Sequence, residues 1–141
     1  MTEELDINYL LKNKHRVNWK KISKRKNFSP AFLYLFQEYI DWKYIICNQN
    51  LSEDLILEFK DRVTWEDISR YQDLSEDFIR KYKNEVNWEW ISRRQKLSNE
   101  FIKEYWNRVN WEWIVKRQKL SKDLIVEFSD MVNWKLISRY Q

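Results

Sequence analysis

Residues 74–96 read LSEDFIRKYKNEVNWEWISRRQK, and this stretch recurs with substitutions along the whole 141-residue chain. An isoleucine follows its tryptophan by three residues in every copy, and a glutamine follows by seven in five of six copies. The recurring tryptophans are spaced by 23 residues and are Trp19, Trp42, Trp65, Trp88, Trp111 and Trp134. A fixed period of this length indicates a repeat architecture. The sequence therefore predicts one domain of six units: 1–27, 28–50, 51–73, 74–96, 97–119 and 120–141, with the first and last as caps.

Each unit contains the signals for two short helices. In residues 97–119, Ser98 is a favoured N-cap for a first helix, and Asn110, directly before Trp111, is a favoured N-cap for a second. One face of the first helix is apolar, at Phe101, Ile102, Tyr105 and Val109. The second helix is expected to bury its Trp together with the Ile and the Gln that follow. Because helices of about eight residues are unstable alone, the units must stack on a shared core, which predicts an all-α solenoid.

The composition excludes several kinds of catalytic and cofactor site. The chain has no glycine, one proline, one cysteine and one histidine, so phosphate-binding glycine loops, zinc ligand sets and disulfides within the chain are excluded. His15 lies in a basic segment and is expected at the surface, while Cys47 occupies an outward position. The paired carboxylates at 53–54 and 76–77 fall in the first turn of capped helices, where the helix dipole explains them. We therefore expect a non-enzymatic protein with no cofactor and no metal.

The sequence also bears on cellular location. The longest uninterrupted apolar run is Ala31–Phe36, which is far too short to cross a bilayer. The N-terminal residues lack the basic-then-apolar order of a secretory signal, and the single cysteine is unpaired. These features predict an intracellular protein that does not bind membranes.

The unit V-N-W-x-x-I-S-x-x-Q-x-L-S-x-x-F-I resembles the short Trp-containing helical repeats of proteins encoded by large DNA viruses and bacteriophages. The resemblance covers nearly the whole chain, although Ile46 and Val115 stand where serine is usual. It implies a non-enzymatic binder in the cytoplasm of an infected cell, plausibly an inhibitor of a host defence complex. It transfers no catalytic or binding residues to this sequence.

The outward face of the second helix is the predicted binding surface. At 100° per residue, positions one, two, five and six after the repeated Trp point away from the core. The fifth position is cationic in five of six copies, and Trp90 and Trp113 stand at the second position. Aromatic residues and arginine are typical of binding hot spots. The predicted partner-binding residues are Trp90, Trp113, Arg93, Arg94, Lys116, Arg117, Arg70, Tyr71, Lys24, Arg25 and Tyr44.

Structural explanations exist for the same residues. Cations near helix C-termini complement the helix dipole, and Trp90 and Trp113 could pack between units. The six spaced tryptophans are interpreted as wedges in the repeat core rather than ligand-stacking groups. The repeated glutamine is expected to bond to the backbone of the next turn, since buried amides need partners. Trp106, the ninth tryptophan, is expected to cover part of the Trp90 and Trp113 region.

The charge distribution favours a protein partner. Residues 1–27 carry eight Lys and Arg against three acidic residues (+5), whereas residues 51–73 carry three against seven (−4). Residues 74–96 and 97–119 are +2 each. A uniform nucleic-acid groove would not place −4 in its middle, while protein interfaces accommodate alternating patches. Binding of RNA or single-stranded nucleic acid is the alternative, and self-association through the solenoid ends is a third hypothesis.

Overall fold

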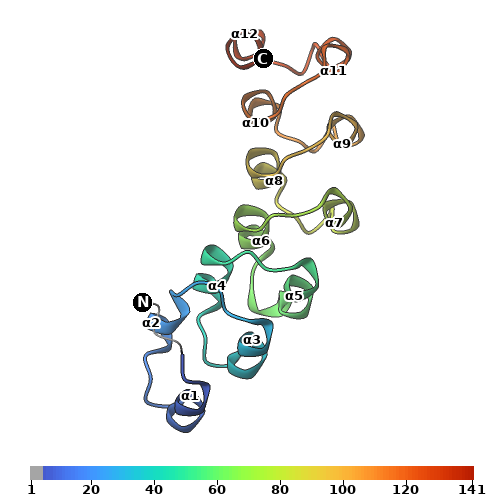
Figure 1. The fold of residues 1–141 in the computed structure, drawn as a ribbon. Helices are drawn as coiled ribbons and strands as arrows, with labels where there is room; N and C mark the ends of the chain where they lie inside the picture. Colours follow the sequence, from blue (N-terminus) through green and yellow to red (C-terminus); the bar gives the residue numbers. More distant parts are fainter. Residues whose placement is uncertain (1–4) are drawn as a thin grey trace. The chain divides into compact units, whose positions relative to one another are not determined.

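The repeat folds as six successive pairs of short α-helices, which confirms the all-α helical solenoid (Figure 1). The computed structural model describes residues 5–141, and these form twelve α-helices and one 3₁₀ helix, Lys60–Arg62. The first helices of the pairs are α1 (Ile7–Asn13), α3 (Pro30–Phe36), α5 (Glu53–Glu58), α7 (Glu76–Lys81), α9 (Asn99–Glu104) and α11 (Lys122–Glu127). The second helices are α2 (Trp19–Ser23), α4 (Trp42–Asn48), α6 (Trp65–Tyr71), α8 (Trp88–Arg94), α10 (Trp111–Arg117) and α12 (Trp134–Tyr140).

Side-chain caps begin every helix pair, as the sequence predicts. The caps of the first helices are Asp6, Ser29, Ser52, Ser75, Ser98 and Ser121, each accepting a backbone N–H three residues later. The caps of the second helices are Asn18, Asp41, Thr64, Asn87, Asn110 and Asn133. Within residues 5–141 only Asn27 has a positive φ, 65°, and Asn tolerates this region. The turns therefore form without glycine.

The first helices are shorter than the apolar spacing predicts. The sequence places Val86 and Val109 on the same helical face as the aromatic residues before them, but α7 ends at Lys81 and α9 ends at Glu104. Each valine lies in the turn after its helix and is buried there. The N–H of Val86 donates to the Tyr82 carbonyl at 3.0 Å. The valine thus closes the helix end instead of extending the helix.

Backbone contacts divide the chain into two compact units, one ending at Gln49 and one spanning Asn50–Gln141. In the first unit α2 packs on α4. In the second, α6, α8, α10 and α12 pack side by side in sequence order, and Figure 1 shows them as one row beside a row of α5, α7, α9 and α11. The isoleucine of each second helix in this row up to α10 is completely buried: Ile68, Ile91 and Ile114. The expectation of a single domain remains a prediction.

Four of the repeated tryptophans, Trp19, Trp65, Trp88 and Trp111, contact aromatic rings of the pair that follows. The Trp88 ring centroid lies 5.0 Å from that of Tyr105, and Trp65 lies 5.0 Å from Tyr82. The indole N–H of Trp88 donates to the carbonyl of Lys83, five residues earlier, at 2.9 Å. The ring contacts join α6 and α8 to the pairs that follow them through aromatic stacks.

The tryptophans are less buried than expected. Only Trp42, at 7% exposure, is buried among the six. Trp19, Trp65, Trp88 and Trp111 are half-buried. Trp134 is 56% exposed, since no later first helix lies against it in the described residues. The repeated tryptophans are therefore not uniformly core residues, and the last of the six is the most exposed.

The repeated glutamine bonds to the turn that precedes its own unit, not to the next turn as expected. Gln95 Oε1 accepts the N–H of Leu74 at 3.0 Å, and Gln95 Nε2 donates to the carbonyl of Gln72 at 2.8 Å. Gln118 makes the same pair of bonds one repeat later, to Leu97 at 3.1 Å and to the Gln95 carbonyl at 2.7 Å. The reason is geometric: successive second helices lie side by side, so the end of one meets the end of the previous one.

Three serines form a second set of ties that the sequence reasoning did not identify. Ser92 Oγ donates to the Trp88 carbonyl at 2.7 Å and accepts the N–H of Asn110 at 2.8 Å, and its side chain is completely buried. Ser23 and Ser69 make the equivalent pairs of bonds. Each hydroxyl links a second helix to the N-cap of the next one. The recurrence of Ser four residues after Trp was the available sequence signal.

We expect Gln95→Ala to lower the free energy of unfolding by about 1–3 kcal/mol, because it leaves a buried donor and acceptor unpaired. Gln37→Ala is the matched control, since the Gln37 amide bonds to the Tyr34 carbonyl within its own turn. The control should cost less than about 0.5 kcal/mol. Urea denaturation followed by circular dichroism measures both. Equal losses for the two variants would show that Gln95 does not tie the units together.

Candidate functional site

Cations and indole rings alternate along α6, α8 and α10. Arg70 Cζ lies 4.5 Å from the Trp90 centroid, and Arg93 Cζ lies 5.1 Å from Trp90 and 4.5 Å from Trp113. Lys116 Nζ lies 5.1 Å from Trp113 and continues the series. We call Arg70, Trp90, Arg93, Trp113 and Lys116 the cation–aromatic ladder. Distances below 6 Å are in the range of attractive cation–π contacts.

The stacking of second helices builds this ladder. The cation five residues after one Trp meets the ring two residues after the next Trp, because α6, α8 and α10 lie side by side. The cation at the same position also lies over the ring on its own helix, three residues earlier. Arg93 thereby contacts one indole within α8 and one on α10. The ladder is therefore a product of the repeat register.

Trp90 and Trp113 pack between units and are half-buried, which is the structural alternative that the sequence left open. The indole N–H of Trp113 donates to Glu89 Oε1 at 2.6 Å. The other oxygen of Glu89 accepts from the Asn110 side chain at 2.7 Å. Lys116 forms an ion pair with Glu112. These contacts fix the rings in place, so the two tryptophans are supports of the surface and only partly available to a partner.

A groove of about 510 Å³ is lined by residues of α6, α8 and α10 and of the turns that follow α8 and α10. Its described lining contains five cations and no carboxylate: Arg70, Arg93, Arg94, Lys96 and Arg117, with Tyr71, Trp90, Gln95 and Gln118. Arg94, Lys96 and Arg117 are exposed. Within residues 5–141, Arg94 and Lys96 make no side-chain hydrogen bond, ion pair or ring contact. The groove thus presents unpaired cationic side chains next to side chains that the cation–aromatic ladder holds in place.

The structure brings some of the other predicted site residues to this groove. Tyr71 lines it, with Arg70 Cζ 4.9 Å from its ring. Lys24, Arg25 and Tyr44 belong to the unit that ends at Gln49, where Lys24 Nζ lies 5.2 Å from the Tyr44 ring. None of these three is in the described lining of the groove.

Trp106 lies elsewhere than expected. Its ring stacks on Phe128 with centroids 6.1 Å apart, and its carbonyl accepts the indole N–H of Trp111 at 3.0 Å. It does not belong to the described lining of the groove. The reason is that Trp106 follows a first helix. It therefore lies with the aromatic residues of the first helices and not on the outward face of the second helices.

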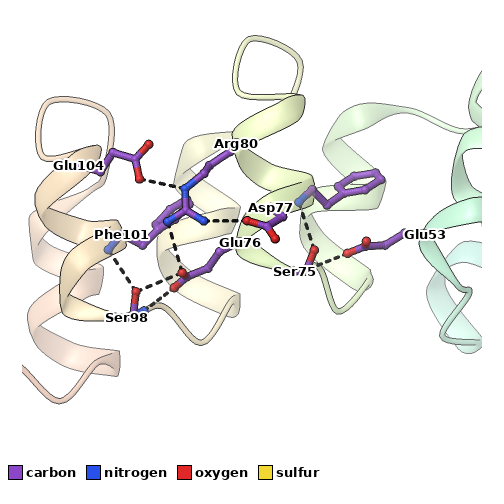
Figure 2. Close-up of polar contacts among 9 residues, drawn as sticks. Glu53, Ser75, Glu76, Asp77, Arg80, Ser98, Phe101 and Glu104 are labelled. Atoms are coloured by element: carbon purple, nitrogen blue, oxygen red, sulfur yellow. Dashed lines mark hydrogen bonds and ion pairs between the residues drawn. The ribbon is translucent and has the colours of Figure 1, made fainter.

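The carboxylates of the first helices join neighbouring pairs (Figure 2). Glu53 Oε1 accepts the N–H of Ser75 at 2.7 Å. Glu76 accepts both the N–H of Ser98, at 2.6 Å, and its hydroxyl, at 3.1 Å. Glu53 and Glu76 therefore serve the caps of the next first helices, in addition to complementing the helix dipole, and the amide oxygen of Asn99 accepts the N–H of Ser121 in the same way.

Arg80 is the centre of an ion-pair cluster next to these caps (Figure 2). Its guanidinium lies 2.9 Å from Glu104, 3.0 Å from Asp77 and 3.6 Å from Glu76. The hydrogen bond from Arg80 lowers the pKa of Glu104, and the same bond raises the pKa of Arg80. A carboxylate held ionised in this way is a poor proton donor at neutral pH. The cluster is suited to joining α7 and α9.

His15 and Cys47 are the base and nucleophile candidates of the sequence. His15 is exposed and meets Tyr39 at 5.9 Å between ring centroids, and Cys47 is a half-buried free cysteine. Within residues 5–141 no group of three or more His, Cys, Asp or Glu side chains could hold a metal ion. No helix in this part of the chain is long and apolar enough to cross a membrane.

Comparison with protein families, curated proteins and solved structures found no match to this chain. The function is therefore argued from the geometry of the groove and its supports.

We expect Arg93→Met to lower the free energy of unfolding by about 1–2 kcal/mol, because it removes a cation from between two indoles. Arg94→Met is the matched control on the adjacent residue, and its effect should stay within about 0.5 kcal/mol. Urea denaturation monitored by tryptophan fluorescence measures both variants. Identical stabilities of the two variants would contradict a stabilising ladder.

Proposed function

We propose that this chain is a non-enzymatic repeat scaffold that holds a protein partner on the surface formed by α6, α8 and α10. The observation that carries the proposal is the groove whose described lining has five cations and no carboxylate. Positive charge gathered at a concave surface attracts and orients a partner of opposite charge. The residues at the centre of the proposed interface are Arg94, Lys96 and Arg117.

The groove is supported by side chains that are already fixed. Gln95 and Gln118, at its base, are held by hydrogen bonds to the backbone of neighbouring turns. Arg93 and Trp90 are held by the ladder. A surface of ordered side chains loses less conformational entropy on binding than a mobile one. The ordered side chains around the groove therefore favour a binding role for this surface.

The ladder argues for a protein partner over nucleic acid. Proteins bind single-stranded nucleic acid by stacking bases on aromatic faces. Trp90 has one cation from α6 and one from its own helix within about 5 Å, so a base would have to displace an arginine. The unit that supplies Arg70, residues 51–73, also carries a net charge of −4. Both features argue against a continuous binding surface for a polyanion along these helices.

We further propose that the partner belongs to a host defence complex in the cytoplasm of an infected cell. This part of the proposal is supported by the resemblance of the repeat unit to those of large DNA viruses and bacteriophages.

Affinity capture from host cells tests the scaffold function. We expect Arg94→Glu with Arg117→Glu to abolish retention of the protein partner, because the double change reverses the charge of the groove. Lys60→Glu with Lys122→Glu is the matched control, since both lysines are exposed and lie outside the described lining. Mass spectrometry and nucleic-acid recovery are run in parallel on each sample.

The proposal fails if the groove variant and the control retain the same proteins as the unaltered chain. It also fails if the groove variant loses only RNA or DNA, because the partner is then a nucleic acid. Circular dichroism of both variants establishes that the fold is intact.

A further inference from the structure

We propose that the occupant of the groove is an extended acidic segment of the partner, with carboxylates three residues apart that pair with Arg94 and Arg117. This inference rests on the proposed scaffold function and adds the chemistry and spacing of the bound segment. The inference follows from which of the groove cations lie closest to indole rings and which remain exposed.

The cations of the groove fall into two groups. Arg70 and Arg93 lie over indole rings within about 5 Å, so their guanidinium groups are part of the ladder. Arg94 has no side-chain partner within residues 5–141, and Arg117 is 6.0 Å from the Trp113 centroid. The ladder therefore leaves Arg94 and Arg117 as the guanidinium groups that can receive a ligand.

The chemistry of these two side chains favours carboxylates. A guanidinium presents N–H donors in a planar fork that matches the two oxygens of a carboxylate. Lys96, also unpartnered in the described residues, adds a third positive charge beside them. Because the described lining has no carboxylate of its own, an incoming acid meets no repulsion from it.

The repeat sets the spacing of the carboxylates. Arg94 and Arg117 occupy the same position of α8 and α10, which pack directly on each other. Packed helix axes are about 8–10 Å apart. A polyproline-II segment advances about 3.1 Å per residue with three residues per turn, so side chains three apart lie on one side at about 9 Å. In a β-strand, side chains on one face are about 7 or 13 Å apart, which fits less well.

The position of α6 that is equivalent to Arg94 and Arg117 indicates where the acidic residues of the bound segment should end. Tyr71 stands there and lines the groove with its ring beside Arg70. A phenol offers a hydroxyl in place of a positive charge, so no third carboxylate is required at that point. The structure thus points to a segment with two acidic residues in register, followed by a residue that contacts an aromatic ring.

Fluorescence anisotropy with two isomeric peptides tests the inference. One labelled peptide has the sequence Glu-Pro-Pro repeated three times, and the other has three consecutive Glu followed by six Pro. Both have the same charge and composition and favour the polyproline-II conformation. We expect the full chain to bind the first peptide about tenfold more tightly, because only it places carboxylates opposite both arginines.

Variants of the groove complete the test. Arg94→Gln with Arg117→Gln should weaken binding of the spaced peptide by about tenfold or more, because charge-assisted hydrogen bonds are lost. Lys60→Gln with Lys122→Gln should leave it within about twofold, since exposed charges far from the site contribute little. Circular dichroism verifies the fold of both double variants.

Four results would overturn the inference. They are equal affinity for the two peptides, no effect of the arginine variant, and tighter binding of an oligouridylate than of the spaced peptide. The fourth is self-association of the unaltered chain in sedimentation that the arginine variant abolishes, because the occupant is then a second copy.

These outcomes separate the inference from the proposed function. If the spaced peptide fails but charge reversal at Arg94 and Arg117 still abolishes partner capture, the scaffold stands and the acidic segment is wrong. If capture is also unaffected, both are wrong.

Discussion

The hydrogen bonds of the buried glutamine amides, such as those of Gln95 and Gln118, hold neighbouring repeats in register. A helix of seven residues cannot persist alone in water, so each pair depends on its neighbours. The side-chain amide of Gln95 connects neighbouring repeats through both of its polar atoms: Oε1 accepts the N–H of Leu74, and Nε2 donates to the carbonyl of Gln72. The N–H of Leu74 and the carbonyl of Gln72 thereby have hydrogen-bond partners inside the protein, as buried backbone groups require. The aromatic stack from Trp88 to Tyr105 and the hydroxyl of Ser92 act between the same elements.

The register fixed by these ties determines what the surface can become. Once α6, α8 and α10 lie side by side, the fifth residue after one Trp must meet the second residue after the next. Where these positions hold a cation and an indole, a cation–aromatic ladder results, and the next residue along, Arg94 or Arg117, is left exposed. The structural and the binding interpretations of this surface therefore apply to different residues: the ladder packs between repeats, and its exposed neighbours form the centre of the proposed site.

The repeat, the two caps per unit and the all-α solenoid could be predicted from the sequence, because each depends on local spacing. Ser98 and Asn110, for example, identify the two helix starts of their unit without any knowledge of tertiary contacts. The direction of the Gln95 bonds could not be predicted, because it depends on which turn lies beside the end of α8. The position of Val86 was wrong for a related reason: apolar spacing alone does not distinguish a third helical turn from a buried turn residue.

The candidate site was predicted only in part. The helical period of a single helix predicts that Trp90, Arg93 and Arg94 lie on one face. It does not predict which of the two arginines contacts an aromatic ring on the next second helix. The i, i+3 spacing of Trp90 and Arg93 was a usable signal for their contact. The cross-unit contacts of Arg70 and Arg93 required the packing order of α6, α8 and α10.

Native-state amide hydrogen exchange tests the central claim most directly, namely that glutamine amides tie each unit to the turn before it. The N–H groups of Leu74 and Leu97 lie outside any helix and donate to Gln95 and Gln118. The account predicts that they exchange as slowly as helix-core amides such as that of Ile91, and far more slowly than the amide of Lys96, which directly precedes Leu97. Exchange of Leu74 and Leu97 at the rate of Lys96 would contradict it.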